Sequence, residues 1–188
     1  MRTVILYIGM SLDGYIARPN GSVDWMHGQE EAAEFSDSYS ELIREADTVI
    51  MGWNTYHQVT TQLSPGAWPY AGMTTYVLTH RGGVSSQEIR FTPEHPRALI
   101  GALRQQLGGA IWICGGADVV RQLMQADLID RFHISILPTL LGEGIPLFAR
   151  PGQERRLRLL QTRAQDGIVE LIYERRPLPL RPTAGPGD

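Results

Sequence analysis

Residues 111–120 read IWICGGADVV, an apolar run that ends in two glycines and continues into a segment with helical spacing. The apolar residues of that segment recur as on one face of a helix, at Val119, Val120, Leu123 and Met124. Gly115 and Gly116 allow the chain to turn sharply between the two elements. The stretch therefore predicts a strand, a tight turn and a helix, which is the repeating unit of an α/β fold.

Four further apolar, β-branched runs lie at residues 3–9, 48–51, 75–78 and 132–137. Several of them are continuous rather than alternating, which is typical of strands buried on both faces of a parallel sheet. Segments with helical spacing lie between them, at residues 35–46 and 99–107. Because strand and helix alternate in this way, we expect an α/β domain with a mainly parallel central sheet flanked by helices.

The end of the domain has a different pattern. Residues 157–176 read LRLLQTRAQDGIVELIYERR, two strand-like runs joined at Asp166-Gly167, which is a strong hairpin signal. We therefore expect a C-terminal antiparallel β-hairpin to complete the sheet of a single domain at residues 1–176. Residues 177–188 contain four prolines and two glycines among few large side chains, which predicts a disordered tail.

Composition argues against several classes of protein. The 17 basic and 20 acidic side chains give a net charge of -3, without the basic excess of proteins that bind nucleic acid or anionic membranes. The apolar run at the N-terminus is too short for a signal peptide or a membrane span. Cys114 is the only cysteine, which excludes an intrachain disulfide and fits the cytoplasm. The five histidines include no i, i+4 pair, so we expect no metal site.

Three predicted strands end in residues that suit a ligand. These residues are Gly115-Gly116 after one strand, Gly52 with Asn54 and Thr55 after another, and Thr79, His80 and Arg81 after the third. Each group has an ordinary alternative, namely a tight turn, a capped helix start or a solvated charge. The carboxyl ends of parallel strands lie along one edge of the sheet, where open α/β sheets bind ligands. The occurrence of all three groups at strand ends therefore favours a ligand site, in which the backbone amides after Gly116 suit a phosphate.

Four segments, in this order, carry a resemblance to a known family. They are GMSLDGYIA (9–17) followed by Asp24-Trp25, VIMGWNTY (49–56), YVLTHR (76–81) and WICGGADVVRQLMQADLIDRFHISILPTLLGEGIPLF (112–148). With them the chain resembles the dihydrofolate reductase superfamily. It is most similar to the branch that contains the reductase domain of the bifunctional riboflavin-biosynthesis deaminase-reductase and its single-domain relatives. The resemblance implies a dihydrofolate-reductase-like fold and a cytoplasmic NAD(P)H-dependent oxidoreductase that forms a homodimer.

The resemblance also implies a reaction and its site residues. NADPH would pass a hydride to a pteridine-like or aminopyrimidine-like small molecule, as in 5-amino-6-(5-phosphoribosylamino)uracil reductase. Cofactor contacts are implied for Ile8, Gly9 and Ile16 beside the nicotinamide, for Gly52, Trp53, Asn54, Thr55, Thr79, His80 and Arg81 on the adenosine half, and for Gly115, Gly116, Ala117, Asp118 and Val119 on the diphosphate. The substrate side would be lined by Trp25, Phe35 and Tyr39, although Phe35 and Tyr39 equally suit a core.

Two carboxylates are candidates for catalysis. In dihydrofolate reductase an acidic residue on the first helix binds the substrate, and counting back from VIMG places the equivalent position at Ser36, with Asp37 beside it. The proton that the acceptor needs could therefore come from Asp37 or from solvent. The alternative for Asp37 is an exposed helix carboxylate. Asp13 follows the first strand, and its alternative is a turn residue before Gly14.

Departures from the family pattern bear on function. Trp53 stands where family members usually have arginine, which affects the choice between NADPH and NADH. Tyr7 stands where riboflavin-pathway reductases commonly carry lysine, and the 188 residues contain no deaminase zinc motif. Two alternatives stay open: a true dihydrofolate reductase, against which the missing helix acid argues, and a non-catalytic dinucleotide-binding protein.

Overall fold

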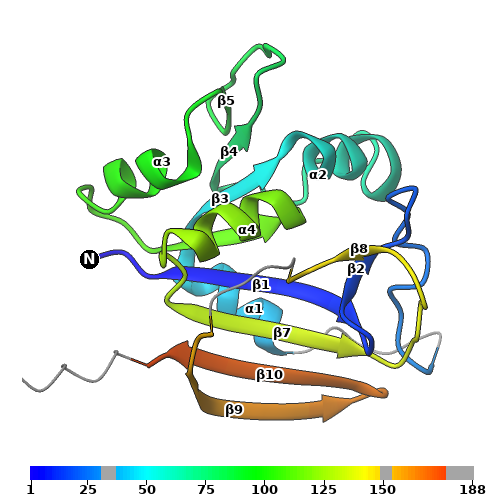
Figure 1. Cartoon of the computed structure of the whole chain (residues 1–188). Helices are drawn as coiled ribbons and strands as arrows, with labels where there is room; N and C mark the ends of the chain where they lie inside the picture. Colours follow the sequence, from blue (N-terminus) through cyan, green and yellow to red (C-terminus); the bar gives the residue numbers. More distant parts are fainter. Residues whose placement is uncertain (31–36, 149–153, 177–188) are drawn as a thin grey trace, which may run out of the picture.

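The strand that ends in the first of the two glycines, β6 (Ala110–Gly115), lies inside an eight-stranded sheet with the order β5-β4-β3-β6-β1-β7-β10-β9 (Figure 1). The computed structural model describes residues 1–30, 37–148 and 154–176. Five strands run parallel with β6: β1 (Val4–Ser11), β3 (Ala46–Gly52), β4 (Thr74–Leu78), β5 (Ile89–Thr92) and β7 (Arg131–Leu137). The predicted mainly parallel sheet is confirmed.

The C-terminal hairpin is also confirmed. β9 (Leu157–Gln165) and β10 (Ile168–Arg175) pair antiparallel, and β10 adds antiparallel to β7. Asp166 and Gly167 form the turn with φ angles of 52° and 74°, the left-handed pair that a two-residue hairpin requires. The Asp166 carboxylate also accepts hydrogen bonds from the backbone N–H groups of Gln29 at 2.9 Å and Glu30 at 2.8 Å. The predicted tail at residues 177–188 lies outside the described residues.

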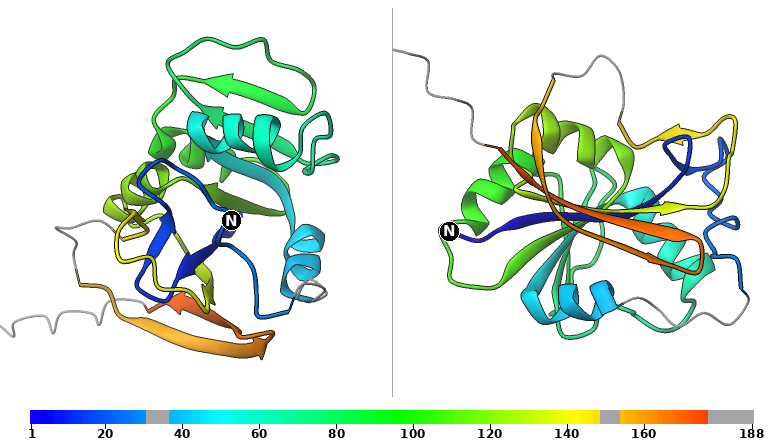
Figure 2. Two further views of the ribbon diagram at one scale, coloured as in Figure 1. Left: turned by 90° about the vertical axis from the view of Figure 1, so that its right-hand side faces the viewer. Right: turned by 90° about the horizontal axis from the view of Figure 1, so that it is seen from below.

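The continuous apolar runs are explained by burial on both faces of the sheet, since Val49, Ile50 and Met51 of β3 are all 0 % exposed. On one face, residues such as Ile50 pack with α3 (Pro96–Leu103) and α4 (Ala117–Gln125). On the other face, residues such as Val49 pack with α1 (Asp37–Glu45). Figure 2 shows α1 and the α3–α4 pair on opposite sides of the sheet.

The remaining elements are short. α2 (Trp53–Gln58) and the turn of π-helix η1 (Val59–Leu63) follow β3, and β2 (Tyr15–Ala17) pairs with β8 (Ile145–Pro146) in a separate sheet. β2, β5 and β8 were not predicted because these segments of two to four residues contain no continuous apolar run long enough to indicate a buried strand. In 1–30, 37–148 and 154–176, no helix combines the length and the apolar character that crossing a membrane requires.

The second predicted helix extends less far than its leucine spacing indicates. α3 ends at Leu103, and Leu107 is fully exposed, so the prediction that it continues the helical stripe was wrong. The C-cap Arg104 still has helical angles, and Gly108 then takes a φ of +157°, which a helix does not allow.

Candidate functional site

A cleft of about 1450 Å³ opens at the carboxyl ends of the central parallel strands. Its lining includes the residues that end β3, β4 and β6, namely Gly52, Leu78 and Gly115, together with Ile8 and Gly9 of β1. All fifteen residues for which the resemblance implies cofactor contacts line this one cleft. The sheet therefore brings together the three strand-end groups as the strand-end argument predicted, while contact of any of the fifteen residues with a cofactor stays a prediction.

The two glycine turns lie side by side at the ends of the adjacent strands β3 and β6. A Cβ atom on Gly116 would lie 3.4 Å from Thr55 Oγ1, and one on Gly52 would lie 3.4 Å from Val119 Cγ2. Gly115 has a φ of +131°, which side chains rarely adopt. The backbone of Gly115 therefore favours glycine, and Cβ atoms on Gly52 and Gly116 would reach the neighbouring loop at van der Waals distance.

The start of α4 is suited to an anionic group. Gly116 is the N-cap and offers no side-chain acceptor to the first amides of the nine-residue helix. Asp118 lies in this first turn, where its carboxylate accepts hydrogen bonds from the side chains of Arg121 and Gln122. The hydrogen bond from Arg121 lowers the pKa of Asp118, so this carboxylate stays ionised near neutral pH.

Arg81 is held at the cleft by Trp53. Its guanidinium carbon lies 5.7 Å from the centroid of the indole ring, within the range of a cation–π contact. The ring of Trp53 also stacks with His57, with 6.2 Å between centroids. Trp53, which stands where the resemblance implies an arginine, thus contacts another arginine, a relationship that no sequence pattern reveals.

A second part of the lining is aromatic and was missed by the sequence analysis. Tyr70 packs edge-on against Trp112 at 5.0 Å, Tyr7 packs edge-on against the same indole at 6.2 Å, and the Tyr70 hydroxyl lies 3.6 Å from Cys114 Sγ. Burial raises the pKa of Cys114 to about 11, and it raises the pKa of Tyr70 well above its usual range. We call Tyr7, Tyr70, Trp112 and Cys114 the aromatic wall.

A signal for part of this wall was present. Trp112 and Cys114 are two residues apart in a predicted strand, and they therefore share one face of the sheet. Because this strand is apolar on both faces, its sequence did not show which face would line a cleft. Tyr70 lies in a loop before β4, so its approach to Trp112 could not be predicted from spacing.

The predicted substrate residues have three different outcomes. Trp25 is 3 % exposed and is not among the described residues that line the cleft, whereas its neighbour Met26 is, so a contact of Trp25 with substrate stays a prediction. Tyr39 packs behind the aromatic wall, 6.0 Å from the Trp112 ring and 6.2 Å from the Tyr7 ring, which matches its alternative as a core residue. Phe35 lies outside the described residues.

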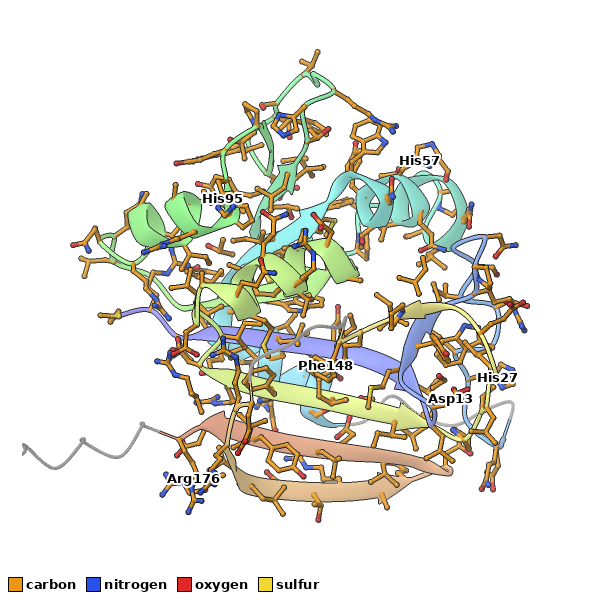
Figure 3. The ribbon with its side chains drawn as sticks, in the orientation of Figure 1. Asp13, His27, His57, His95, Phe148 and Arg176 are labelled. Atoms are coloured by element: carbon orange, nitrogen blue, oxygen red, sulfur yellow. The ribbon has the colours of Figure 1, made fainter. Side chains whose placement is uncertain are left out.

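The structure supports the turn interpretation of Asp13. Its carboxylate accepts hydrogen bonds from Ser11 Oγ at 2.5 Å and from the backbone N–H groups of Gly142 at 2.7 Å and Leu141 at 3.2 Å. The hydrogen bond from Ser11 is the main cause that lowers the pKa of Asp13. Asp13 is not among the described residues that line the cleft, and Figure 3 shows it well apart from His57, which does.

Asp37 is the first residue of α1, and its side chain belongs to the undescribed part of the structure. Its role as a proton donor therefore stays a prediction. Within the described ranges, no group of three or more His, Cys, Asp or Glu side chains is arranged to hold a metal ion.

A buried polar cluster lies behind Tyr7. The Tyr7 hydroxyl is 3.1 Å from Ser38 Oγ, and Ser38 donates to Glu170 Oε1 at 2.5 Å. His133 is 8 % exposed and its ring lies 5.9 Å from the Tyr7 ring. Burial lowers the pKa of His133 to about 4, so the imidazole is neutral at pH 7.

Comparison with known proteins agrees with the resemblance seen in the sequence. The family model described as the RibD C-terminal domain matches residues 2–169. The uncharacterized protein YwjB of Bacillus subtilis (strain 168) is 41 % identical over 175 residues, which cover 93 % of this chain and 98 % of YwjB.

Two solved structures have the same fold. A putative riboflavin biosynthesis protein from Shewanella sp. PV-4 superposes with a TM-score of 0.80 and 26 % identity, covering 93 % of this chain and 99 % of that one. A diaminohydroxyphosphoribosylaminopyrimidine deaminase/5-amino-6-(5-phosphoribosylamino)uracil reductase from Thermotoga maritima has a TM-score of 0.69 and 14 % identity, covering 93 % of this chain and 57 % of that one. The second likeness shows the fold alone. Together with the sheet topology, these comparisons confirm the predicted fold class.

Proposed function

The chain belongs to the RibD C-terminal domain family, in its riboflavin-biosynthesis reductase-like branch, and we propose that it is an NADPH-dependent reductase. Its acceptor would be a small pteridine-like or aminopyrimidine-like molecule. The observation that carries the proposal is the single cleft that collects all fifteen candidate cofactor residues at the carboxyl edge of the parallel sheet.

The residues of the cleft fit a dinucleotide. The glycine backbone at Gly115 and Gly116 leaves space that a side chain would fill beside Thr55, and the uncapped start of α4 offers amides to a diphosphate. Arg81, held over Trp53, offers a guanidinium to a ribose 2′-phosphate. When bound, NADPH would supply the hydride.

The protein's own part in the reaction would be to bind, orient and exclude water. Ile8, Gly9 and Ile16 line the cleft and would border the nicotinamide, with the aromatic wall beside them. Such positioning can account for a large part of a hydride-transfer rate, because it replaces an encounter between two molecules with a prearranged contact. Asp37 or solvent would supply the proton.

Two measurements test the proposal and separate it from a non-catalytic dinucleotide-binding protein. Two of the four tryptophans, Trp53 and Trp112, line the cleft, so NADPH binding should quench the protein fluorescence. Oxidation of NADPH in the presence of pterins or aminopyrimidines then tests turnover. Binding without turnover of any acceptor would favour the non-catalytic protein, and no binding would contradict both.

We further propose a cytoplasmic protein that forms a homodimer and has neither nucleic acid nor membrane as a partner. The net charge of -3 supports the last point. Light scattering during gel filtration measures the oligomeric state, and a mass near 21.0 kDa would contradict the dimer.

A further inference from the structure

The charges of the cleft are not spread evenly. Among its described lining residues, the Asp, Glu, Lys and Arg side chains are Arg81, Glu94 and Asp118. Arg81 and Glu94 follow β4 and β5 at one edge of the sheet, and Arg81 is held there by Trp53. β4 is two strands from β6, which carries Trp112 and Cys114, and three strands from β1, which carries Tyr7, so about 10 to 14 Å separates β4 from the strands of the aromatic wall.

The third charge lies on the opposite face of the sheet from the aromatic wall. Asp118 belongs to α4, which packs on the face that contains Ile113 and Val120. Trp112, Tyr7, Tyr70 and Cys114 belong to the cluster on the α1 face. The sheet thus separates the aromatic wall from the carboxylate of Asp118.

The aromatic wall itself is neutral, and contacts among its members hold it in place. Burial keeps the Tyr70 hydroxyl and the Cys114 thiol protonated at neutral pH. The Trp112 indole is fixed between edge-on contacts to Tyr70 and Tyr7, and its Nε1–H donates to the Tyr7 carbonyl oxygen at 3.2 Å. The wall therefore offers aromatic surface and hydroxyl or thiol groups, with no formal charge from these four residues.

We propose that the molecule reduced in this cleft is a flat heterocycle without a phosphate group, bound against the aromatic wall. The inference rests on the proposed function and narrows its substrate class. A flat ring gains stacking contacts with Tyr7 and Tyr70, which the buried Trp112 indole supports from behind. A phosphate at the same place would lose its hydration beside a neutral surface, which is costly without a cation to compensate.

A matched pair of ligands tests the proposal on the unmodified protein. 6-Hydroxymethylpterin and its phosphate monoester share one ring and differ in the phosphate alone. Each is titrated by calorimetry, once with NADP⁺ at saturation and once without it. We expect the unphosphorylated pterin to bind at least tenfold more tightly than the ester. Equal or tighter binding of the ester, or no binding of either compound under both conditions, would overturn the proposal.

A variant pair tests the place of binding. Tyr70→Leu removes one ring of the wall and should weaken 6-hydroxymethylpterin about tenfold or more, while NADP⁺ affinity stays the same. Tyr76→Leu is the control, since Tyr76 contacts Arg90 and is not a lining residue of the cleft. If folded Tyr70→Leu and the parent bind 6-hydroxymethylpterin with equal affinity, the proposal that the ring binds against the aromatic wall is overturned.

If Tyr70→Leu does not fold, the comparison of 6-hydroxymethylpterin with its phosphate ester still decides whether the cleft excludes a phosphate. Failure of the proposed reductase function gives a different result, because NADPH would then not bind or would not be oxidised, and this does not depend on how tightly the two pterins bind.

Discussion

The guanidinium group of Arg81 lies over the indole ring of Trp53, with its carbon 5.7 Å from the ring centroid, and both residues line the cleft. The contact joins the loop after β4 to the first residue of α2. An exposed cation–π contact contributes about 0.5–1 kcal/mol, enough to bias where the arginine rests. The residue that departs from the family pattern therefore supports the arginine that remains.

This contact leads to a prediction about cofactor choice. Arg81→Ala should weaken NADPH by roughly ten- to a hundredfold and leave NADH almost unchanged, because only NADPH has a 2′-phosphate to accept its hydrogen bonds. Dissociation constants for both cofactors measure the effect. Arg90→Ala is the matched control, since Arg90 lies 5.6 Å from the Tyr76 ring and neither residue lines the cleft. If Arg81→Ala weakens both cofactors by the same factor, Arg81 does not recognise the phosphate.

Gly116→Val should greatly weaken dinucleotide binding in a protein that still folds. The new Cβ would lie 3.4 Å from Thr55 Oγ1, and its methyl groups would extend into the space between the two glycine turns. Gly101→Val provides the comparison, because a Cβ on Gly101 in α3 meets nothing within 4 Å. NADPH titration, with circular dichroism to check folding, measures both variants. An unchanged NADPH affinity in folded Gly116→Val would show that the diphosphate does not bind at this turn.

Reduction of dihydrofolate should be weak or absent. Ser36 cannot hold a pterin ring by the paired hydrogen bonds that a carboxylate makes, and the neutral aromatic wall offers no cation to the carboxylates of folate. NADPH oxidation with dihydrofolate at high enzyme concentration is the measurement. A turnover number in the usual enzyme range of roughly 1 to 1000 per second would instead favour the alternative of a true dihydrofolate reductase.

The burial of His133 predicts an acid-sensitive fold. Burial, and to a lesser extent Arg131, lower the pKa of His133 to about 4 from its ordinary value of 6.5, although Glu170 and Glu41 act in the opposite direction. Below pH 6.5 the unfolded chain therefore binds a proton that the folded protein excludes. This loss of stability grows as the pH falls toward 4, by at most about 1.4 kcal/mol per pH unit.

Urea unfolding of the parent and of His133→Gln between pH 7 and pH 4.5 measures this contribution. The variant should lose part of the pH dependence, whereas the exposed His27→Gln should keep it. The same decline of stability with falling pH in His133→Gln and the parent would show that His133 does not control it.

Asp13→Ala should lower the melting temperature by a few degrees and leave NADPH affinity unchanged. Its carboxylate accepts three hydrogen bonds from Ser11, Leu141 and Gly142, and it thereby joins the turn after β1 to a loop more than a hundred residues away. Differential scanning calorimetry and NADPH titration provide the two measurements. Loss of turnover in an equally stable Asp13→Ala protein would restore Asp13 as a catalytic candidate.

Much of the fold could be predicted because it depends on local patterns. Val49, Ile50 and Met51 form a continuous apolar run, and a strand with such a run must be buried on both faces, as these residues are. Asp166-Gly167 suits the left-handed angles of a hairpin turn, and the turn forms at these two residues. The gathering of strand ends into one cleft follows from the parallel direction of the strands.

The sequence by itself therefore determined the fold class, the hairpin and the edge of the sheet at which the cleft lies. Only the tertiary structure decided which side chains meet there: Met26 instead of Trp25 at the cleft, Arg81 over Trp53, and Tyr70 against Trp112. Hydrophobic periodicity and turn residues carry information only about residues that are close together in the sequence. Contacts such as Tyr70 to Trp112 join residues far apart in sequence, and they depend on the strand order β4-β3-β6-β1, which packing selects only when the whole sheet assembles.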